Sequence, residues 1–422
     1  MEVGDEVRVV RDGEVYEGVL APRIEYGGED FIVVKLRSGY NIGVRVSDGK
    51  VQVEKLPARR EVRYKSPVIP EAKATLPSVA ILGTGGTIAS RVDYRTGAVT
   101  PIFSADDLYG FTPELAGIAR IDVETVFNIF SEDMTPKHWS IIAYKIGEYV
   151  SKGIDGIIVT HGTDTMGYTA AALSFALRNL PVPVILVGAQ RSPDRPSSDA
   201  ALNLIGAVTA AAYAPFAEVV VAMHKGLSDD EVAFHRGTRV RKCHTSRRDA
   251  FKSINSDQVA VYRDYKIEML TEDYRRRGED GFRVEAEFEE RVALIKFYPG
   301  FDPKIIEWYI DDGYRGLVIE GTGLGHVSSR CIPALKRAVD SGVFVGMTSQ
   351  CLWGRINMSV YRTGRELQAV GVVPLEDMLP ETALVKLMWV LARVDDVGEA
   401  RRLMLTNIAG EIFRRTSFRW YA

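Results

Sequence analysis

The sequence predicts an α/β fold in which two α/β units with mostly parallel sheets follow a small all-β barrel. Three observations lead to this prediction. Short strand-like runs separated by glycine turns fill residues 5–49, apolar runs alternate with helical stretches from Val79 onward, and a second set of apolar runs follows a charged interruption at 272–291. With 422 residues, of which 46% are hydrophobic, the chain can bury two or three separate cores.

The first unit, residues 1–75, is predicted to be a small antiparallel barrel or sandwich followed by a linker. Its strand-like runs are separated by Asp-Gly, Gly-Gly and Ser-Gly pairs, which are typical of hairpin turns. The runs are residues 5–10, 16–20, 31–36 and 41–46. A charged stretch that begins at Lys55 and contains Pro67, Pro70 and Pro77 is typical of a semi-extended tether.

The second unit, residues 76–285, and the third, residues 286–422, are both predicted to contain parallel strands. Buried parallel strands are nearly continuous apolar runs, and the connections between them are helices. Such runs occur at residues 79–82, 156–160, 184–188, 219–223, 293–297, 317–320 and 343–347. Apolar residues at helical spacing predict helices over 136–150 and 166–180, and a helix-rich region from Pro380 to Ile412 ends the chain.

Composition limits the classes of function. The formal net charge is −3, so no overall field attracts the molecule to nucleic acid or to an anionic membrane. The N-terminus lacks the basic start and apolar core of a signal peptide, and the apolar runs are shorter than a membrane span, which predicts a cytoplasmic protein. Three widely spaced cysteines, an odd number, favour reduced thiols over disulfides or a zinc site.

Two turns rich in glycine and threonine are the strongest candidates for a functional site. One is Leu82–Ile88, in which Thr87 follows two glycines, and the other is Val159–Met166, in which Thr163 precedes Asp164. Each turn follows a predicted strand. Because the carboxyl ends of parallel strands share one edge of a sheet, we expect both turns to form a single site.

A threonine hydroxyl needs a neighbouring base before it can act as a nucleophile, and Lys242 is the candidate. Four arginines near it in the sequence are expected to repel its positive charge and to favour the neutral, basic form. They are Arg239, Arg241, Arg247 and Arg248.

The same residues also have purely structural interpretations, which the spacing leaves open. Thr87 and Asp164 each suit a helix cap, and Lys242 in a basic segment suits a solvated surface position. His161 suits a hydrogen-bonded structural histidine. Ser131 and Glu132 suit the start of a helix before Pro136.

Other chemistries fit less well. Ile88 occupies the third glycine position of a dinucleotide-binding fingerprint, and no phosphate-binding lysine follows. Cys243 and His244 are adjacent, and neighbours in an extended segment point to opposite faces, which disfavours a thiol amidase. No set of His, Cys, Asp and Glu residues has metal-ligand spacing, so no metal or cofactor is expected in this chain.

The two turns and the lysine segment resemble the signature motifs of the bacterial-type asparaginase family. The matching residues are Thr84–Ala89, His161–Met166 and Lys242 ahead of Ser246–Phe251, and the resemblance covers roughly residues 77 to 415. Ordinary asparaginases have no N-terminal barrel. A barrel ahead of an asparaginase-like body resembles the family of D-type subunits of archaeal glutamyl-tRNA(Gln) amidotransferases.

The resemblance implies a role for each candidate catalytic residue. Thr87 would attack a side-chain amide and form an acyl-enzyme with release of ammonia, while Thr163, Asp164 and Lys242 would form a second hydroxyl–base group. The order in which the two threonines act stays open. The resemblance further implies that the active sites are shared across a dimer interface.

The resemblance also implies a binding role for three residues. Ser131 and Glu132 fall where the family binds the α-carboxylate of its substrate, although glutamine is common at the position of Glu132. Tyr94 is the candidate for the tyrosine of the family's mobile loop.

The predicted function is therefore an amidohydrolase subunit that releases ammonia from glutamine or asparagine. A partner subunit would bind tRNA and use ATP and magnesium to convert Glu-tRNA(Gln) to Gln-tRNA(Gln), with a homodimer of this chain inside a heterotetramer. Two alternatives stay open: a free-standing cytoplasmic L-asparaginase, and a non-catalytic module that senses amides.

Contact with RNA is assigned mainly to the partner. Residues 1–75 contain equal numbers of acidic and basic side chains, so the barrel is no evident phosphate binder. The basic stretch Lys55–Lys65 suits either RNA contact or a solvated linker.

Overall fold

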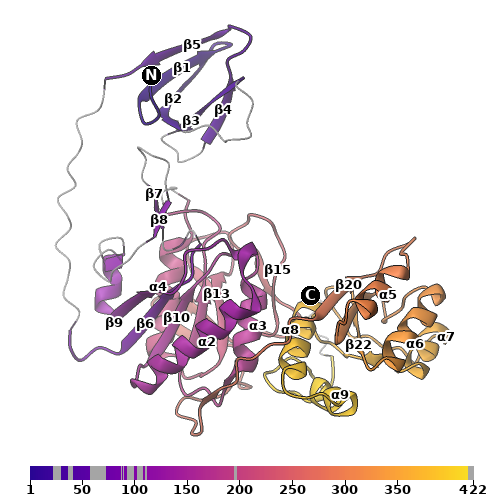
Figure 1. The fold of residues 1–422 in the computed structure, drawn as a ribbon. Coiled ribbons are helices and arrows are strands. Elements are labelled where there is room, and N and C mark those ends of the chain that lie inside the picture. The colour runs from indigo at the N-terminus through magenta and orange to yellow at the C-terminus, as the bar shows by residue number, and fades with distance from the viewer. Residues whose placement is uncertain are drawn as a thin grey trace.

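The computed structural model describes residues 1–21, 30–36, 41–57, 73–86, 88, 90–92, 99–101, 108–109, 112–193 and 197–416 (Figure 1). For residues 90–92 and 99–101 only the backbone is described. Two of the predicted site residues, Thr87 and Tyr94, lie outside the described residues.

The chain begins with an antiparallel sheet of five strands, called here the N-terminal sheet, in the order β4-β3-β2-β1-β5. Its strands are β1 (Glu6–Arg11), β2 (Glu14–Ala21), β3 (Phe31–Leu36), β4 (Asn41–Arg45) and β5 (Val51–Lys55). Asp12 and Gly13 both have positive φ angles, as the tight β1–β2 turn requires. Alternate residues of the strands, centred on Val7, Val9 and Val34, enclose a small core. The all-β prediction for this region is confirmed.

The central sheet has eight strands in the order β18-β17-β14-β13-β12-β10-β6-β9 (Figure 1). Its parallel strands are β6 (Ser78–Gly83), β9 (Arg120–Thr125), β10 (Gly156–Thr160), β12 (Val184–Val187) and β13 (Val219–His224). The antiparallel strands β14 (Glu231–Arg236), β17 (Ala260–Arg263) and β18 (Lys266–Met269) extend it. The sequence did not predict β9 or this antiparallel extension.

Helices cover both faces of the central sheet, as expected for buried parallel strands. On one face, α2 (Pro136–Ser151) and α3 (Met166–Ala176) pack against residues such as Leu82 and Val159. On the other face, α4 (Ala200–Tyr213) packs against residues such as Ile81 and Ile158. The strands are apolar on both sides, which explains why they appear in the sequence as continuous rather than alternating apolar runs.

The strand order reverses direction at β6 and β10. Strand β6 lies between β9 and β10, so the chain moves to one side of β6 and then crosses back to the other. In open α/β sheets such a reversal leaves a gap between connections at the carboxyl ends of the strands, where ligands bind. Both glycine and threonine turns begin at this edge.

Shorter elements complete this part of the chain. Three two-stranded sheets pair β7 with β8, β11 with β19, and β15 with β16. Their bounds are β7 (Ser90–Val92), β8 (Val99–Pro101), β11 (Leu177–Arg178), β15 (Val240–Lys242), β16 (Phe251–Ser253) and β19 (Arg283–Val284). Among the described residues, the 3₁₀ turns here are η2 (Pro113–Gly117) and η3 (Ser131–Asp133), and η4 (Ser329–Cys331) lies further along the chain, directly before α6.

Residues 292–416 form a second α/β layer, called here the C-terminal lobe, drawn in orange and yellow in Figure 1. Its parallel sheet has the order β20-β21-β22-β23, with β20 (Val292–Lys296), β21 (Gly316–Gly321), β22 (Phe344–Ser349) and β23 (Val373–Pro374). Its helices are α5 (Lys304–Asp311), α6 (Ile332–Asp340), α7 (Arg362–Ala369), α8 (Pro380–Leu391) and α9 (Val397–Leu405). The predicted α/β class with mostly parallel sheets is confirmed.

Helix α3 joins the two layers because it is apolar almost all the way round. One side faces the central sheet through Leu173, while Phe175 on another side packs into a core that contains Trp389 of α8. This shared core fixes the C-terminal lobe against the helix that directly follows the second threonine turn.

None of the helices in the described part of the chain is long and apolar enough to span a membrane.

Candidate active site

The two glycine and threonine turns touch each other at the carboxyl ends of β6 and β10. Gly83 pairs with Thr160, and the Thr84 hydroxyl donates a hydrogen bond of 2.7 Å to the Thr160 carbonyl. Gly86 has a φ of 84°, and a Cβ atom on it would lie 2.7 Å from the Gly162 nitrogen. Only glycine allows the two backbones to approach this closely, which explains the glycine directly before Thr87.

Ser131 lies against the second turn, whereas Glu132 is exposed beside it. A Cβ atom on Gly162 would come within 2.7 Å of the Ser131 Cβ, and the Thr165 hydroxyl donates to the Ser131 carbonyl at 2.6 Å. Ser131 is buried, and its hydroxyl lies 3.5 Å from the Glu132 carboxylate. The two residues do not begin helix α2, whose N-cap is Thr135.

Lys242 reaches across from the β15–β16 hairpin to the second turn. Its Nζ atom lies 2.8 Å from Thr163 Oγ1 and 2.8 Å from Asp164 Oδ1. The lysine side chain is only 13% exposed, while the Asp164 carboxylate is 69% exposed. An amine in contact with both a hydroxyl and a carboxylate can take a proton from the hydroxyl while the carboxylate stabilises the resulting ammonium.

His161 is buried and supports the second turn through hydrogen bonds. The Trp139 indole donates to Thr169 Oγ1 at 3.1 Å, and the same hydroxyl lies 2.8 Å from His161 Nε2. His161 Nδ1 then donates to the Gly162 carbonyl at 2.7 Å. Burial lowers the pKa of His161 to about 4, so the ring is neutral and holds the peptide before Thr163 in place.

The loop after β12 closes the other side of the second turn. A Cβ atom on Gly188 would lie 2.8 Å from Thr163 Cγ2, so glycine is needed for this contact. The buried Asp199 carboxylate accepts hydrogen bonds from the backbone nitrogens of Gln190 and Arg191 at 3.0 and 2.9 Å, which fixes the path of the loop.

A chain of polar groups, buried from Asp199 to His224, continues from Asp199 and was missed by the sequence reasoning. Asn203 donates to Asp199 at 3.1 Å and contacts His224 at 2.6 Å, and His224 lies 3.0 Å from Asp229, which pairs with Arg248. This chain connects the loop after β12 with the loop that follows Lys242. Its signal in the sequence was the pair of polar residues four apart at the start of the otherwise apolar helix α4.

The four arginines that neighbour Lys242 in the sequence are not unpaired charges. Each of the four neighbouring arginines pairs with a carboxylate: Arg239 with Asp377, Arg241 with Glu381, Arg247 with Asp249 and Arg248 with Asp229. Three of these four acids are distant in the sequence, so a local charge count overstated the positive field at the lysine.

The structure also disfavours a thiol mechanism at Cys243. Burial raises the pKa of the Cys243 thiol, which favours the unreactive protonated form. His244 Nδ1 accepts from the backbone nitrogens of Ser246 and Arg247 at 3.1 Å each, and so belongs to its own loop. Among the described residues, no three His, Cys, Asp or Glu side chains come together in a way that could hold a metal ion.

Three family models match separate parts of the chain. The GatD N-terminal domain matches residues 1–54, the N-terminal asparaginase domain matches residues 78–275, and the glutaminase/asparaginase C-terminal domain matches residues 291–404.

Curated relatives match the whole chain. The D-type subunit of the glutamyl-tRNA(Gln) amidotransferase of Pyrococcus furiosus is 56% identical, and the match covers 98% of this chain and 95% of that protein. The proteins of the same name from Thermococcus kodakarensis and Methanopyrus kandleri are each 54% identical, over 99% and 98% of this chain and 96% and 92% of their own lengths.

Solved structures match the asparaginase-like body. The thermostable L-asparaginase from Thermococcus kodakarensis superposes with a TM-score of 0.72 at 34% identity, covering 80% of this chain and all of that chain. L-asparaginase I from Vibrio cholerae gives a TM-score of 0.68 at 29% identity, over 80% of this chain and 99% of that one. The resemblance seen in the motifs is confirmed, and the chain belongs to the GatD family, the D-type subunits of glutamyl-tRNA(Gln) amidotransferases.

Proposed function

We propose that this chain hydrolyses the side-chain amide of glutamine or asparagine and supplies the ammonia to a partner subunit. The partner uses it to convert Glu-tRNA(Gln) to Gln-tRNA(Gln). The observation that carries the amidohydrolase assignment is the contact of Lys242 with both Thr163 and Asp164, at 2.8 Å each, beside the point where the two glycine turns touch. The names of the full-length relatives support the link to tRNA.

The proposed reaction has two halves. Thr87 attacks the amide carbon, its oxygen–carbon bond forms, the carbon–nitrogen bond breaks, and ammonia leaves with the hydroxyl proton. Water then attacks the ester and releases the free acid. Thr163, Lys242 and Asp164 move protons during these steps, because an amine held between a hydroxyl and a carboxylate can exchange a proton with the first and be charge-stabilised by the second.

Three further residues are proposed to bind the substrate. Ser131, buried against Gly162, contacts the α-carboxylate, and Tyr94 is the candidate for a further substrate contact. The exposed carboxylate of Glu132 suits the positively charged α-ammonium group of the amino acid.

The remaining chemistry belongs to the partner in this proposal. The partner binds Glu-tRNA(Gln) and uses ATP and magnesium, while this chain needs no cofactor of its own and forms a homodimer within a heterotetramer in the cytoplasm.

The test measures ammonia release from glutamine and asparagine by the wild type and by Thr87→Ala, Thr163→Ala and Lys242→Ala. Loss of the nucleophile or of a proton-transfer group should lower kcat by at least about 100-fold. Lys304→Ala, which changes a lysine at the start of α5, is the control and should be as active as the wild type. Full activity in all three site variants would refute the mechanism, and tight amino-acid binding without turnover in the wild type would indicate a sensing module instead.

A free-standing L-asparaginase is the second candidate. The structural likeness to L-asparaginases over 80% of the chain favours it. If the protein is a free-standing asparaginase, hydrolysis should run at its full rate without any partner. The N-terminal sheet should then have no part in the reaction.

A further inference from the structure

The hairpin that carries Lys242 has little support from strand pairing. Strands β15 and β16 form a two-stranded sheet to which the described part of the chain adds no third strand. An isolated hairpin is only marginally stable, so other contacts must set its orientation. One face, with Val240 and Phe251, packs into the core beside α3. The polar groups at the base of the hairpin point instead to the C-terminal lobe.

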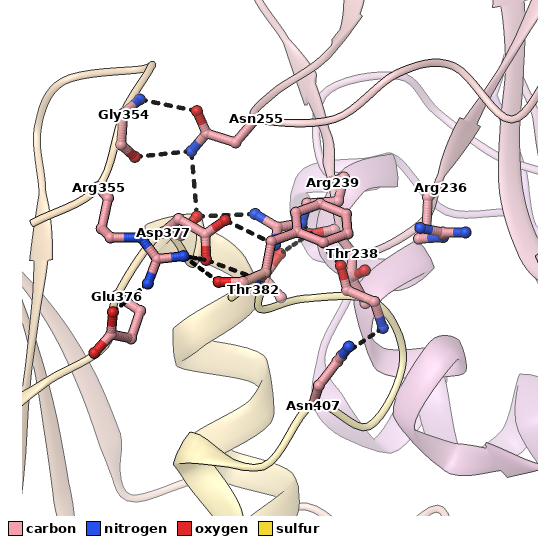
Figure 2. A network of polar contacts seen from close by, with 12 residues as sticks. Arg236, Thr238, Arg239, Asn255, Gly354, Arg355, Glu376, Asp377, Thr382 and Asn407 are labelled. Carbon is pink, nitrogen blue, oxygen red and sulfur yellow. Dashed lines mark hydrogen bonds and ion pairs between the residues drawn. The ribbon is translucent and has the colours of Figure 1, made fainter. Parts of the chain in front are cut away.

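Arg239, directly before β15, is the centre of these polar contacts (Figure 2). Its guanidinium donates to the Asp377 carbonyl at 2.9 Å and to the Asp377 carboxylate at 3.1 Å, and its Nε donates to the Gly410 carbonyl at 2.9 Å. The group also lies 4.3 Å from the centre of the Phe413 ring. Both side chains of the ion pair are inaccessible to solvent, at 0% and 1% exposure.

Asp377 is itself held on several sides. Its carboxylate accepts from the Phe413 backbone nitrogen at 3.1 Å, and its carbonyl accepts from Asn255 Nδ2 at 3.3 Å. Asn255 also exchanges two hydrogen bonds with the Gly354 backbone, at 2.8 and 2.9 Å. Asn255 follows β16 closely, so both strands of the hairpin are tied to the same point of the C-terminal lobe (Figure 2).

Two more contacts flank this point. The Thr382 hydroxyl donates to the Thr238 carbonyl at 2.9 Å, and Arg241 pairs with Glu381 at 3.2 Å. Residues 238, 239 and 241 therefore all bind the segment 377–382, at the start of α8. Lys242 is the next residue of the strand, and its side chain contacts Thr163 and Asp164 instead.

Strand β15 is held by the C-terminal lobe at Arg239, and it carries the catalytic candidate Lys242 at its other end. Arg239 and Lys242 are three residues apart, which is about 10 Å of extended strand. A small shift at the fixed end moves the lysine nitrogen relative to Thr163, and misplacement by about 1 Å can lower a catalysed rate by about 100-fold.

From these contacts we infer that Arg239 and Asp377 are positioning residues, which hold the hairpin so that Lys242 meets Thr163 and Asp164. The inference rests on the proposed amide hydrolysis. If so, the C-terminal lobe contributes to catalysis through the Arg239–Asp377 ion pair, which does not itself touch the substrate.

The test compares Asp377→Asn with the wild type in ammonia release. We expect kcat to fall by roughly 10- to 100-fold while KM changes by less than about threefold, because the substrate contacts remain. In a Lys242→Ala background the same substitution should cause no further loss, since the pair acts only through the lysine.

The matched control is Glu218→Gln. It removes the charge of a carboxylate that pairs with Arg236 at 2.8 Å and makes no hydrogen bond or ion pair to residues 377–382. It should lower the melting temperature as Asp377→Asn does but leave kcat unchanged. If Asp377→Asn does not fold, Arg239→Lys provides the same comparison, because it keeps the charge and removes the forked geometry.

Two results would overturn the inference. One is a folded Asp377→Asn or Arg239→Lys variant with wild-type kcat, and the other is an equal loss in the Lys242→Ala background. A wild-type protein that releases no ammonia from either amide would instead refute the proposed function, and the inference with it.

Discussion

At the scale of single residues, burial keeps two histidine side chains in their neutral form. His161 and His235 are both shielded from water, and burial lowers their pKa values to about 4 and about 3. His161 has a hydrogen-bond partner on each ring nitrogen, whereas His235 contacts Ser253 at 2.8 Å through Nδ1, and its Nε2 has no partner among the described residues. A proton on either ring would be a buried charge.

The low pKa values predict a loss of stability in acid. Above the ordinary histidine pKa of about 6.5, neither the folded nor the unfolded state binds the proton, so the contribution to stability is fully present. As the pH falls from about 6.5 to about 4, the unfolded chain takes up the proton at His161 and the folded chain does not. This difference lowers the free energy of unfolding by about 3 kcal/mol.

Urea unfolding of the wild type and of His161→Gln at several pH values measures this effect. Near pH 8 the difference between the two proteins reports the cost of altered packing alone. Toward pH 4 the variant should lose less stability than the wild type. Parallel pH curves for the two proteins would contradict the prediction.

At the scale of secondary-structure elements, helix α4 depends on a side chain from far along the chain. Arg277 donates to the carbonyl groups of Ala211 and Ala214 at the end of this helix, at 2.6 and 2.5 Å, and to the Asp155 carbonyl at 2.6 Å. The last carbonyl groups of a helix have no partner within it and carry partial negative charge, so a guanidinium there satisfies and stabilises them.

Arg277→Ala should therefore lower the free energy of unfolding by about 2 kcal/mol. The adjacent Arg276 is a matched control, because it is exposed and its guanidinium lies 5.3 Å from the Tyr274 ring. Arg276→Ala should cost less than about 1 kcal/mol. Chemical denaturation of the two variants checks the difference, and equal costs would show that the contacts to α4 contribute nothing.

The sequence predicted some elements better than others for physical reasons. Strands such as β10 and β12 are buried on both faces, so their residues form uninterrupted apolar runs. Edge strand β9 alternates charged and apolar residues, and β15 has two positive side chains out of three, so neither has the composition of a core strand. The position of β15 depends on contacts with residues 377–382, more than 130 positions away, which no local pattern contains.

The sequence likewise indicated some residues of the candidate site and not others. The motifs indicated Thr163, Asp164 and Lys242, and the structure brings these side chains into contact. Their roles in catalysis remain predictions. The carboxylates that neutralise the surrounding arginines were not predictable, because Asp377, Glu381 and Asp229 approach only through the packing of the C-terminal lobe and of the loop after β13.

At the scale of the whole molecule, the hydrophobic cores show which parts depend on each other. The central sheet and the C-terminal lobe share the core around Phe175 and Trp389 and the polar contacts of Arg239. The N-terminal sheet has a core of its own around Val7 and Val34, to which the described part of the chain contributes residues of β1–β5 alone. The contacts that the described residues make in the candidate site all come from the other two parts.

Removal of residues 1–72 should therefore leave ammonia release within about threefold of the full-length rate, because every described contact of Lys242 and Thr163 is retained. If the N-terminal sheet contributes to the complex with the partner subunit, the deletion should lower the transfer of ammonia to Glu-tRNA(Gln) much more than it lowers ammonia release. Both hydrolysis and transfer are measured for each protein. Full-length Val9→Asp, which places a charge in the small core, is a control that keeps the chain length.

Equal loss of both activities would mean that the sheet supports the site itself. Unimpaired transfer would show that the sheet has no role in the complex and would favour the free-standing asparaginase.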